Sequence, residues 1–134
     1  MEFDHIGIAV KSIEDYFDKQ LNSVLGVPEL SEIIIDPIQN CRIAFATTSN
    51  GVRLELIEPL NEESPVNQIL QKKKGGLYHI CFKTENFDQD LKHCLVNKYI
   101  ALGKPQPAIA FNNRRIVFLS SPTFEIIELV EEIS

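Results

Sequence analysis

The chain has 134 residues, of which 44% are hydrophobic and 24% charged, and its formal net charge is −6 at pH 7. This length predicts one domain, and the apolar content is too high for a disordered chain. No apolar run approaches the roughly 20 residues that span a bilayer, and the acidic balance argues against a general nucleic-acid-binding protein.

The three cysteines, Cys41, Cys81 and Cys94, are scattered and show no CxxC pair or zinc-finger spacing. We therefore expect three reduced thiols in a cytoplasmic protein, with a catalytic thiol as the alternative. The first residues are acidic and place no basic segment before their apolar stretch, so no signal peptide is expected.

The first half of the chain predicts a strand, a helix and three more strands. Residues 3–10 alternate and are rich in β-branched side chains, which is typical of a strand. A helix is expected over 12–25, because Ser12 can cap its start and Gly26 can end it. The three further strands are expected at 30–35, 41–47 and 53–58.

The second half repeats this order. A polar stretch at 61–76 comes first and contains a candidate short helix that Ser64 would cap. A strand is then expected at 77–84 and a helix at 87–98. Strands 107–111, 115–120 and 125–131 would complete the half.

Two kinds of polar residue obey this repeat. His5 and His79 lie 74 positions apart in the first strand of each half, and Glu55 and Glu128 lie 73 positions apart in the last strand. We therefore expect an α+β fold in a single domain, 1–134. Its first module would cover about 1–60, its linker 61–76 and its second module about 77–134.

The alternation of side chains predicts where these four residues point. Each lies on the strand face opposite the clearest apolar stripe, which would pack under the helices. If the polar face met only solvent, the four would be ordinary surface residues. The small neighbours Gly7 and Ala9 leave room on that face and favour a site instead.

Two imidazoles and two carboxylates, brought together by a curved sheet, would form a divalent metal site with nitrogen and oxygen donors. Without a thiolate, such a site suits Co, Mn, Ni, Zn or Fe(II) better than a structural zinc. A six-coordinate metal with four protein ligands keeps two positions open, which indicates chemistry on a bound oxygen atom.

Several sequence words resemble one family. They are DHIGIAV (4–10), LELIEPLNEESPV (54–66), GGLYHICF (75–82), RRIVFL (114–119) and IIEL (126–129). Together they resemble the vicinal oxygen chelate superfamily, which is the glyoxalase, extradiol dioxygenase and bleomycin-resistance group. Within it they are most similar to the methylmalonyl-CoA epimerases.

The resemblance implies a specific fold and site. It implies paired βαβββ modules that form a cupped, eight-stranded mixed sheet with a glyoxalase-like fold. It also implies a homodimer and one divalent metal ion, whose ligands carry over to His5, Glu55, His79 and Glu128.

The sequence departs from the epimerase pattern in three places. Tyr78 stands where the epimerases usually have a first His, before the retained His79. The segment 120–124, SSPTF, lacks the family's Gly-rich turn, and that loop borders the substrate mouth in the family. A second catalytic Glu found on the third strand of some epimerases has no counterpart at 41–43, CRI.

The implied activity is an epimerase that moves the α-proton of a 2-acyl thioester, similar to methylmalonyl-CoA, through a metal-stabilised enolate. Glu128 is the first candidate for proton transfer and Glu55 is its partner. The expected partner molecule is a small acyl-CoA or related thioester, with no nucleic acid or membrane. Because CoA is a polyanion, cations would attract it locally, and the candidates are Lys72, Lys73, Lys74, Arg42, Arg53, Lys104, Arg114 and Arg115.

Other functions stay open. The strongest is an isomerase, epimerase or lyase of the same superfamily that acts on another thioester, which could be carrier-bound. A glyoxalase I-like lactoylglutathione lyase and an extradiol dioxygenase would use a similar donor set. A metal-free binding or resistance protein is the non-enzymatic alternative, although such proteins typically lose ligands that this chain keeps.

Overall fold

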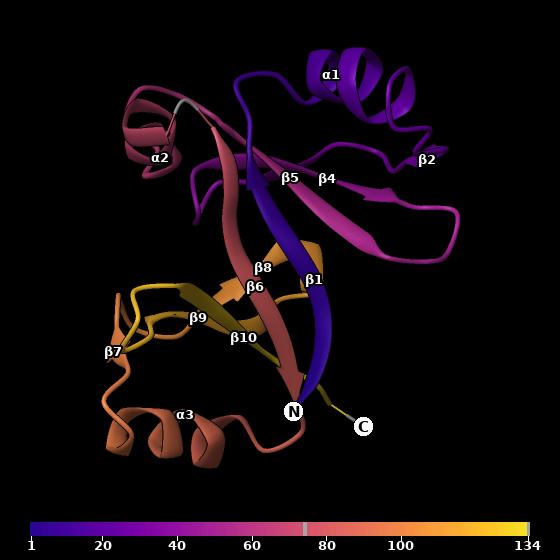
Figure 1. The fold of residues 1–134 in the computed structure, drawn as a ribbon. Helices are drawn as coiled ribbons and strands as arrows, with labels where there is room; N and C mark the ends of the chain where they lie inside the picture. The colour runs from indigo at the N-terminus through magenta and orange to yellow at the C-terminus, as the bar shows by residue number, and fades with distance from the viewer. Residues whose placement is uncertain (74, 134) are drawn as a thin grey trace. The chain divides into compact units, whose positions relative to one another are not determined.

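The computed structural model describes residues 1–73 and 75–133, and these contain ten strands and three α-helices (Figure 1). The chain divides into two compact units. The first unit is His5–Tyr78, and the second unit combines Met1–Asp4 with the chain from His79 onward. None of the described helices is long and apolar enough to cross a membrane.

The first unit contains one mixed set of strands and two helices. Its strand order is β2-β4-β5-β1, with β3 also paired to β4; the β1–β5 pair is parallel, and the pairs of β4 with β2, β3 and β5 are antiparallel. The helix α1 starts where the Ser12 hydroxyl accepts a hydrogen bond from the Asp15 N–H at 3.2 Å, and it continues into a π-helical turn, Phe17–Asn22. The elements are β1 (Glu2–Ala9, shared with the second unit), α1 (Ile13–Tyr16), β2 (Glu29–Leu30), β3 (Ile34–Asp36), β4 (Cys41–Thr47), β5 (Arg53–Pro59) and α2 (Val66–Lys73).

The second unit repeats this arrangement. Its strand order is β6-β10-β9-β7, with β8 also paired to β9; the β6–β10 pair is parallel, and the pairs of β9 with β7, β8 and β10 are antiparallel. The elements are β6 (Gly76–Thr84, which begins in the first unit), α3 (Phe87–Val96), β7 (Ile100–Ala101), β8 (Gln106–Ala108), β9 (Arg114–Ser120) and β10 (Ile126–Glu131). The predicted α+β class and the predicted order of long strands and helices are therefore confirmed.

The predicted number of eight strands was wrong, because one expected strand is divided in two and one short strand was not expected. The strand expected at 30–35 is divided into β2 and β3, since the Ser31 hydroxyl accepts a hydrogen bond from the Phe45 N–H at 2.8 Å and interrupts the ladder. The strand expected at 107–111 ends at Ala108 and continues as a 3₁₀ turn. The two-residue strand β7 was not predicted at all.

Each unit has an apolar core under its helix, on the face that the sequence predicted. In the first unit Ile8 of β1 and Val10, just after the end of β1, pack with Ile13 of α1 and Leu56 of β5. In the second unit the core residues are Phe87, Cys94, Val117, Leu119 and Leu129. Successive side chains point to opposite faces of a strand, so the residues before and after each core residue point away from the core. We call this second face of the strands the site face.

Candidate functional site

The first unit brings His5 and Glu55 together on its site face. The parallel register places Gly7 of β1 beside Glu55 of β5, so His5 is two positions from the residue that pairs with Glu55. The His5 Nε2 and Glu55 Oε1 atoms are 3.4 Å apart, and the two residues are only 0% and 3% exposed.

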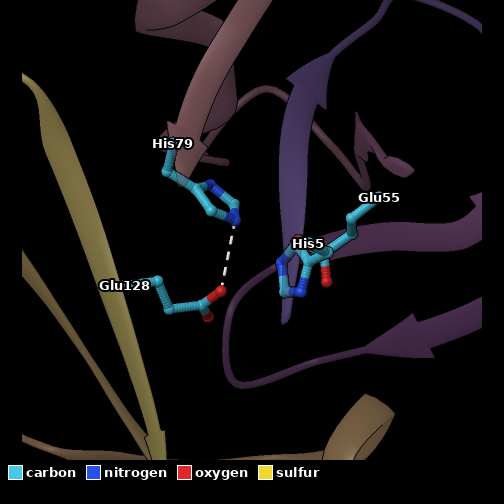
Figure 2. Close-up of side chains that lie close together, drawn as sticks. All are labelled: His5, Glu55, His79 and Glu128. Atoms are coloured by element: carbon cyan, nitrogen blue, oxygen red, sulfur yellow. Dashed lines mark ion pairs between the residues drawn. The ribbon is translucent and has the colours of Figure 1, made fainter. Parts of the chain in front are cut away.

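The second unit brings His79 and Glu128 together in the same way. Cys81 of β6 pairs with Glu128 of β10, so His79 again lies two positions before the partner of the carboxylate. The His79 Nε2 and Glu128 Oε1 atoms are 3.1 Å apart, which is the ion pair drawn as a dashed line in Figure 2. Both residues are buried. The repeat found in the sequence therefore produces the same His–Glu pair twice.

An aromatic residue completes each pair, and the sequence analysis missed both. Phe45 of β4 lies directly across from Glu55, and Phe118 of β9 lies directly across from Glu128. The Phe45 ring meets the His5 ring edge to face at 5.7 Å, and the Phe118 ring meets the His79 ring at 5.2 Å. Their separation of 73 positions, equal to that of the two Glu residues, is the signal that could have identified them.

The donor atoms of each pair suit a metal ion. Two atoms that bind one cation at about 2.1 Å from neighbouring positions of an octahedron lie about 3.0 Å apart. The observed separations of 3.4 and 3.1 Å are close to this value. Buried carboxylates also need a positive partner, because removing their charge from water is costly. These His and Glu side chains could therefore hold a metal ion.

Arg42 and Arg115, two predicted CoA contacts, instead join strands to helices on the face opposite the site. Arg42 contacts Glu58 of β5 at 2.6 Å and Glu14 of α1 at 3.4 Å. Its counterpart Arg115 contacts Glu131 of β10 at 2.6 Å and Asp88 of α3 at 3.0 Å. These two networks also follow the repeat.

The charges in these networks perturb one another. The hydrogen bond from Arg115 lowers the pKa of Glu131, and a second one from the same guanidinium lowers the pKa of Asp88. The hydrogen bond to Glu58 likewise raises the pKa of Arg42. Arg42 and Arg115 are thus held in scaffold ion pairs.

The other predicted cations are distributed differently. Arg53 starts β5 two residues before Glu55, on the site face, and Arg114 starts β9. Lys72 and Lys104 are exposed, whereas Lys74 lies outside the described residues. The segment 41–43, where some epimerases have a second catalytic Glu, lies on β4. Cys41 and Ile43 share the site face with Phe45. The site face of β4 therefore carries no carboxylate.

The segment that replaces the family's Gly-rich turn forms a tight loop. The Ser121 and Thr123 hydroxyls donate hydrogen bonds to the Glu125 carboxylate, and these hydrogen bonds lower its pKa. Phe124 at the tip has a φ of 72°, an unusual value for a bulky residue, and its side chain is 85% exposed.

Two βαβββ units, each with a buried His–Glu pair on its first and last long strands, define a duplicated α+β protein whose paired side chains could hold a metal ion. The model of the Glyoxalase/Bleomycin resistance protein/Dioxygenase superfamily matches residues 4–118. The chain belongs to this superfamily, and its glyoxalase-like fold is confirmed.

The chain is similar to several individual known proteins. The Bacillus subtilis protein YqjC, which is uncharacterized, is 38% identical over 117 residues, covering 87% of this chain and 81% of YqjC. Mouse mitochondrial methylmalonyl-CoA epimerase is 29% identical over 120 residues, covering 87% of this chain and 64% of that protein. A solved Streptomyces coelicolor methylmalonyl-CoA epimerase, a variant in complex with 2-nitronate-propionyl-CoA, has a TM-score of 0.80 and 27% identity. That match covers 100% of this chain and 99% of the other.

Proposed function

We propose that the chain is a metal-dependent epimerase that moves the α-proton of a 2-acyl thioester of the methylmalonyl-CoA type. The observation that carries this proposal is the duplicated, buried His–Glu pair at corresponding positions of the two units. The substrate class is supported by the mouse and Streptomyces relatives, which are named as methylmalonyl-CoA epimerases.

In this proposal His5, Glu55, His79 and Glu128 bind one divalent cation together. Their nitrogen and oxygen donors favour Co, Mn, Ni, Zn or Fe(II). When bound, the cation supplies a Lewis acid for the thioester carbonyl oxygen and lowers the cost of the negative charge that develops there.

Glu55 and Glu128 are the proposed proton carriers. Inversion at the α-carbon requires that one face loses a proton and the opposite face gains one, so two positioned groups are needed. One Glu, as a carboxylate, takes the α-proton, and the C–H electron pair passes into the enolate. The other Glu, as a carboxylic acid, gives its proton to the α-carbon from the opposite face and is left as a carboxylate. A carboxylate from each unit supplies such a pair, whereas the third-strand segment 41–43 supplies no carboxylate.

The experiment that tests the function is metal analysis of the purified protein, followed by deuterium wash-in at C2 of methylmalonyl-CoA. Stoichiometric metal and exchange at C2 are expected. A protein that takes up no divalent metal would contradict the enzyme proposal. Metal without exchange would contradict methylmalonyl-CoA as the substrate and direct the search to another thioester.

One observation favours a second candidate, an epimerase or isomerase of another thioester, such as a carrier-bound one. The loop 121–125 has a different turn from the Gly-rich one expected for the family, and it presents Phe124 at its tip. Exchange at C2 of a carrier-bound acyl thioester, but not of its CoA ester, would support this candidate.

The proposal also includes a cytoplasmic homodimer. All three cysteines are buried as thiols, which suits a reducing compartment. Light scattering during size-exclusion chromatography should give twice the mass of 15.2 kDa, and a monomer mass would contradict the dimer.

A further inference from the structure

Arg53 lies beside both members of the first His–Glu pair. It precedes Glu55 by two residues on β5, so the two side chains leave the same face of the strand. The parallel register pairs Ile6 with Leu54, and therefore His5 and Arg53, one residue earlier in each strand, are neighbours on that face. A fixed positive charge thus borders the candidate metal ligands.

The Arg53 guanidinium is held by an aromatic ring. Its central carbon lies 4.2 Å from the centroid of the Phe45 ring, and the Phe45 ring lies 5.7 Å from the His5 ring. Only one ring therefore separates the guanidinium from the imidazole. A guanidinium that stacks on an aromatic ring contacts the ring with its flat face, and its N–H groups point outward in the guanidinium plane. In that plane two N–H groups can bind the two oxygens of a carboxylate.

The repeat does not duplicate the cation at this position. The residue 73 positions later is Ile126, which pairs with Ser120 as Arg53 pairs with Thr47. The His, Glu and Phe residues are duplicated in both units, but this Arg is not. The cation is therefore a feature of the first unit, whereas the second unit has an apolar residue at the corresponding position.

We propose that Arg53 binds the acyl carboxylate of the substrate and so selects malonyl-type thioesters over uncharged ones. This inference rests on the proposed function, because it assumes a thioester bound at the metal ligands. Residues two apart on a strand are about 7 Å from each other, so the group that Arg53 contacts belongs to the acyl part of the ligand. The phosphates of CoA are further away, because the pantetheine group separates them from the thioester.

Binding of malonyl-CoA and acetyl-CoA to the whole protein, measured by calorimetry, tests this proposal, since the two ligands differ only by the carboxylate. Arg53→Met should weaken malonyl-CoA binding by about 10- to 100-fold, which is typical of a lost charge-assisted hydrogen bond, and should leave acetyl-CoA binding unchanged. Arg53→Lys should recover part of the loss. Lys92→Met, which removes an exposed charge from α3, is the control and should change neither affinity.

Two results would overturn the role of Arg53: equal weakening of both ligands in Arg53→Met, or no weakening of either. The titration is repeated on metal-free protein. The ratio of the malonyl-CoA affinities of wild type and Arg53→Met should be the same there, because the contact with Arg53 is direct. A loss of affinity confined to metal-loaded protein would also overturn the role of Arg53. The outcome is separate from the proposed reaction. Selective weakening without wash-in at C2 would refute the epimerase alone, whereas wash-in with unaltered selectivity would refute the role of Arg53 alone.

Discussion

The ion-pair network around Arg115 offers a quantitative test of how the second unit holds its helix. Arg115 of β9 joins Glu131 of β10 to Asp88 of α3 and lies over the Phe87 ring. Replacing Arg115 by Met keeps much of the aliphatic length and removes the charge. The folded protein should therefore lose a strand-to-helix connection without losing core volume.

The expected loss of stability can be estimated from the geometry. Arg115 donates two hydrogen bonds to Glu131, at 2.6 and 3.2 Å, and the side chains are 39% and 23% exposed. A charge-assisted pair of this kind contributes about 1–2 kcal/mol, and solvent screening of the half-exposed Arg115 reduces this to about 1 kcal/mol. The contact with the Phe87 ring at 4.6 Å adds about 0.5 kcal/mol. Arg115→Met should thus lower the free energy of unfolding by about 1.5 kcal/mol.

Urea unfolding at several pH values is the assay, with Arg114→Met, the same change one residue earlier, as the control. The pKa of Glu131 is lowered in the folded state, so its contribution is present above its ordinary value of 4.5 and is lost as the pH falls through the lowered value. The difference between wild type and Arg115→Met should therefore shrink below about pH 4.5. A difference that stayed constant down to pH 3, or an equal loss in Arg114→Met, would refute the reasoning.

Three further substitutions, one of them with a matched control, have defined outcomes. Leu129→Ala, at a fully buried core position, should cost about 2–5 kcal/mol in urea unfolding; a loss below about 1 kcal/mol would contradict the assigned core. Gly75→Ala should cost about 2 kcal/mol or more, because φ is +102° and a Cβ would lie 3.0 Å from the Ala9 carbonyl oxygen. Gly51→Ala, with φ +87° and open space, should cost only about 1 kcal/mol, and equal losses would show that the close contact is unimportant. Glu55→Gln keeps an oxygen donor but cannot carry the proton, so metal content should persist while C2 exchange falls at least about 100-fold; undiminished exchange would remove Glu55 from proton transfer.

The sequence predicted the parts of the site that depend on strand alternation and on the repeat. The period of two placed His5 and Glu55 on the face opposite the core, and the offset of 73 to 74 positions identified their counterparts His79 and Glu128. The structure places these residues on the expected strands, because long strands with one buried face have a strongly specified register.

Contacts across strands could not be predicted in the same way. The proximity of Phe45 to His5 depends on the registers of β4 with β5 and of β1 with β5, which join segments far apart in the chain. The interruption near Ser31 depends on a side-chain hydrogen bond to β4 that propensity does not encode. The direction of Arg42, toward Glu58 and away from the site face, follows from alternation and was available from the sequence, yet charge alone made it a candidate CoA contact.

The central claim is that the duplicated His–Glu pairs act together as one metal site. Cobalt titration of the apoprotein, followed by its visible absorption spectrum, tests this claim directly in wild type, His5→Ala and His79→Ala. One cobalt per chain in wild type is predicted, with strongly weakened binding in both variants, because in the proposed site each unit supplies half of the ligands. Two cobalt ions per chain, or a variant that keeps full affinity, would contradict the account.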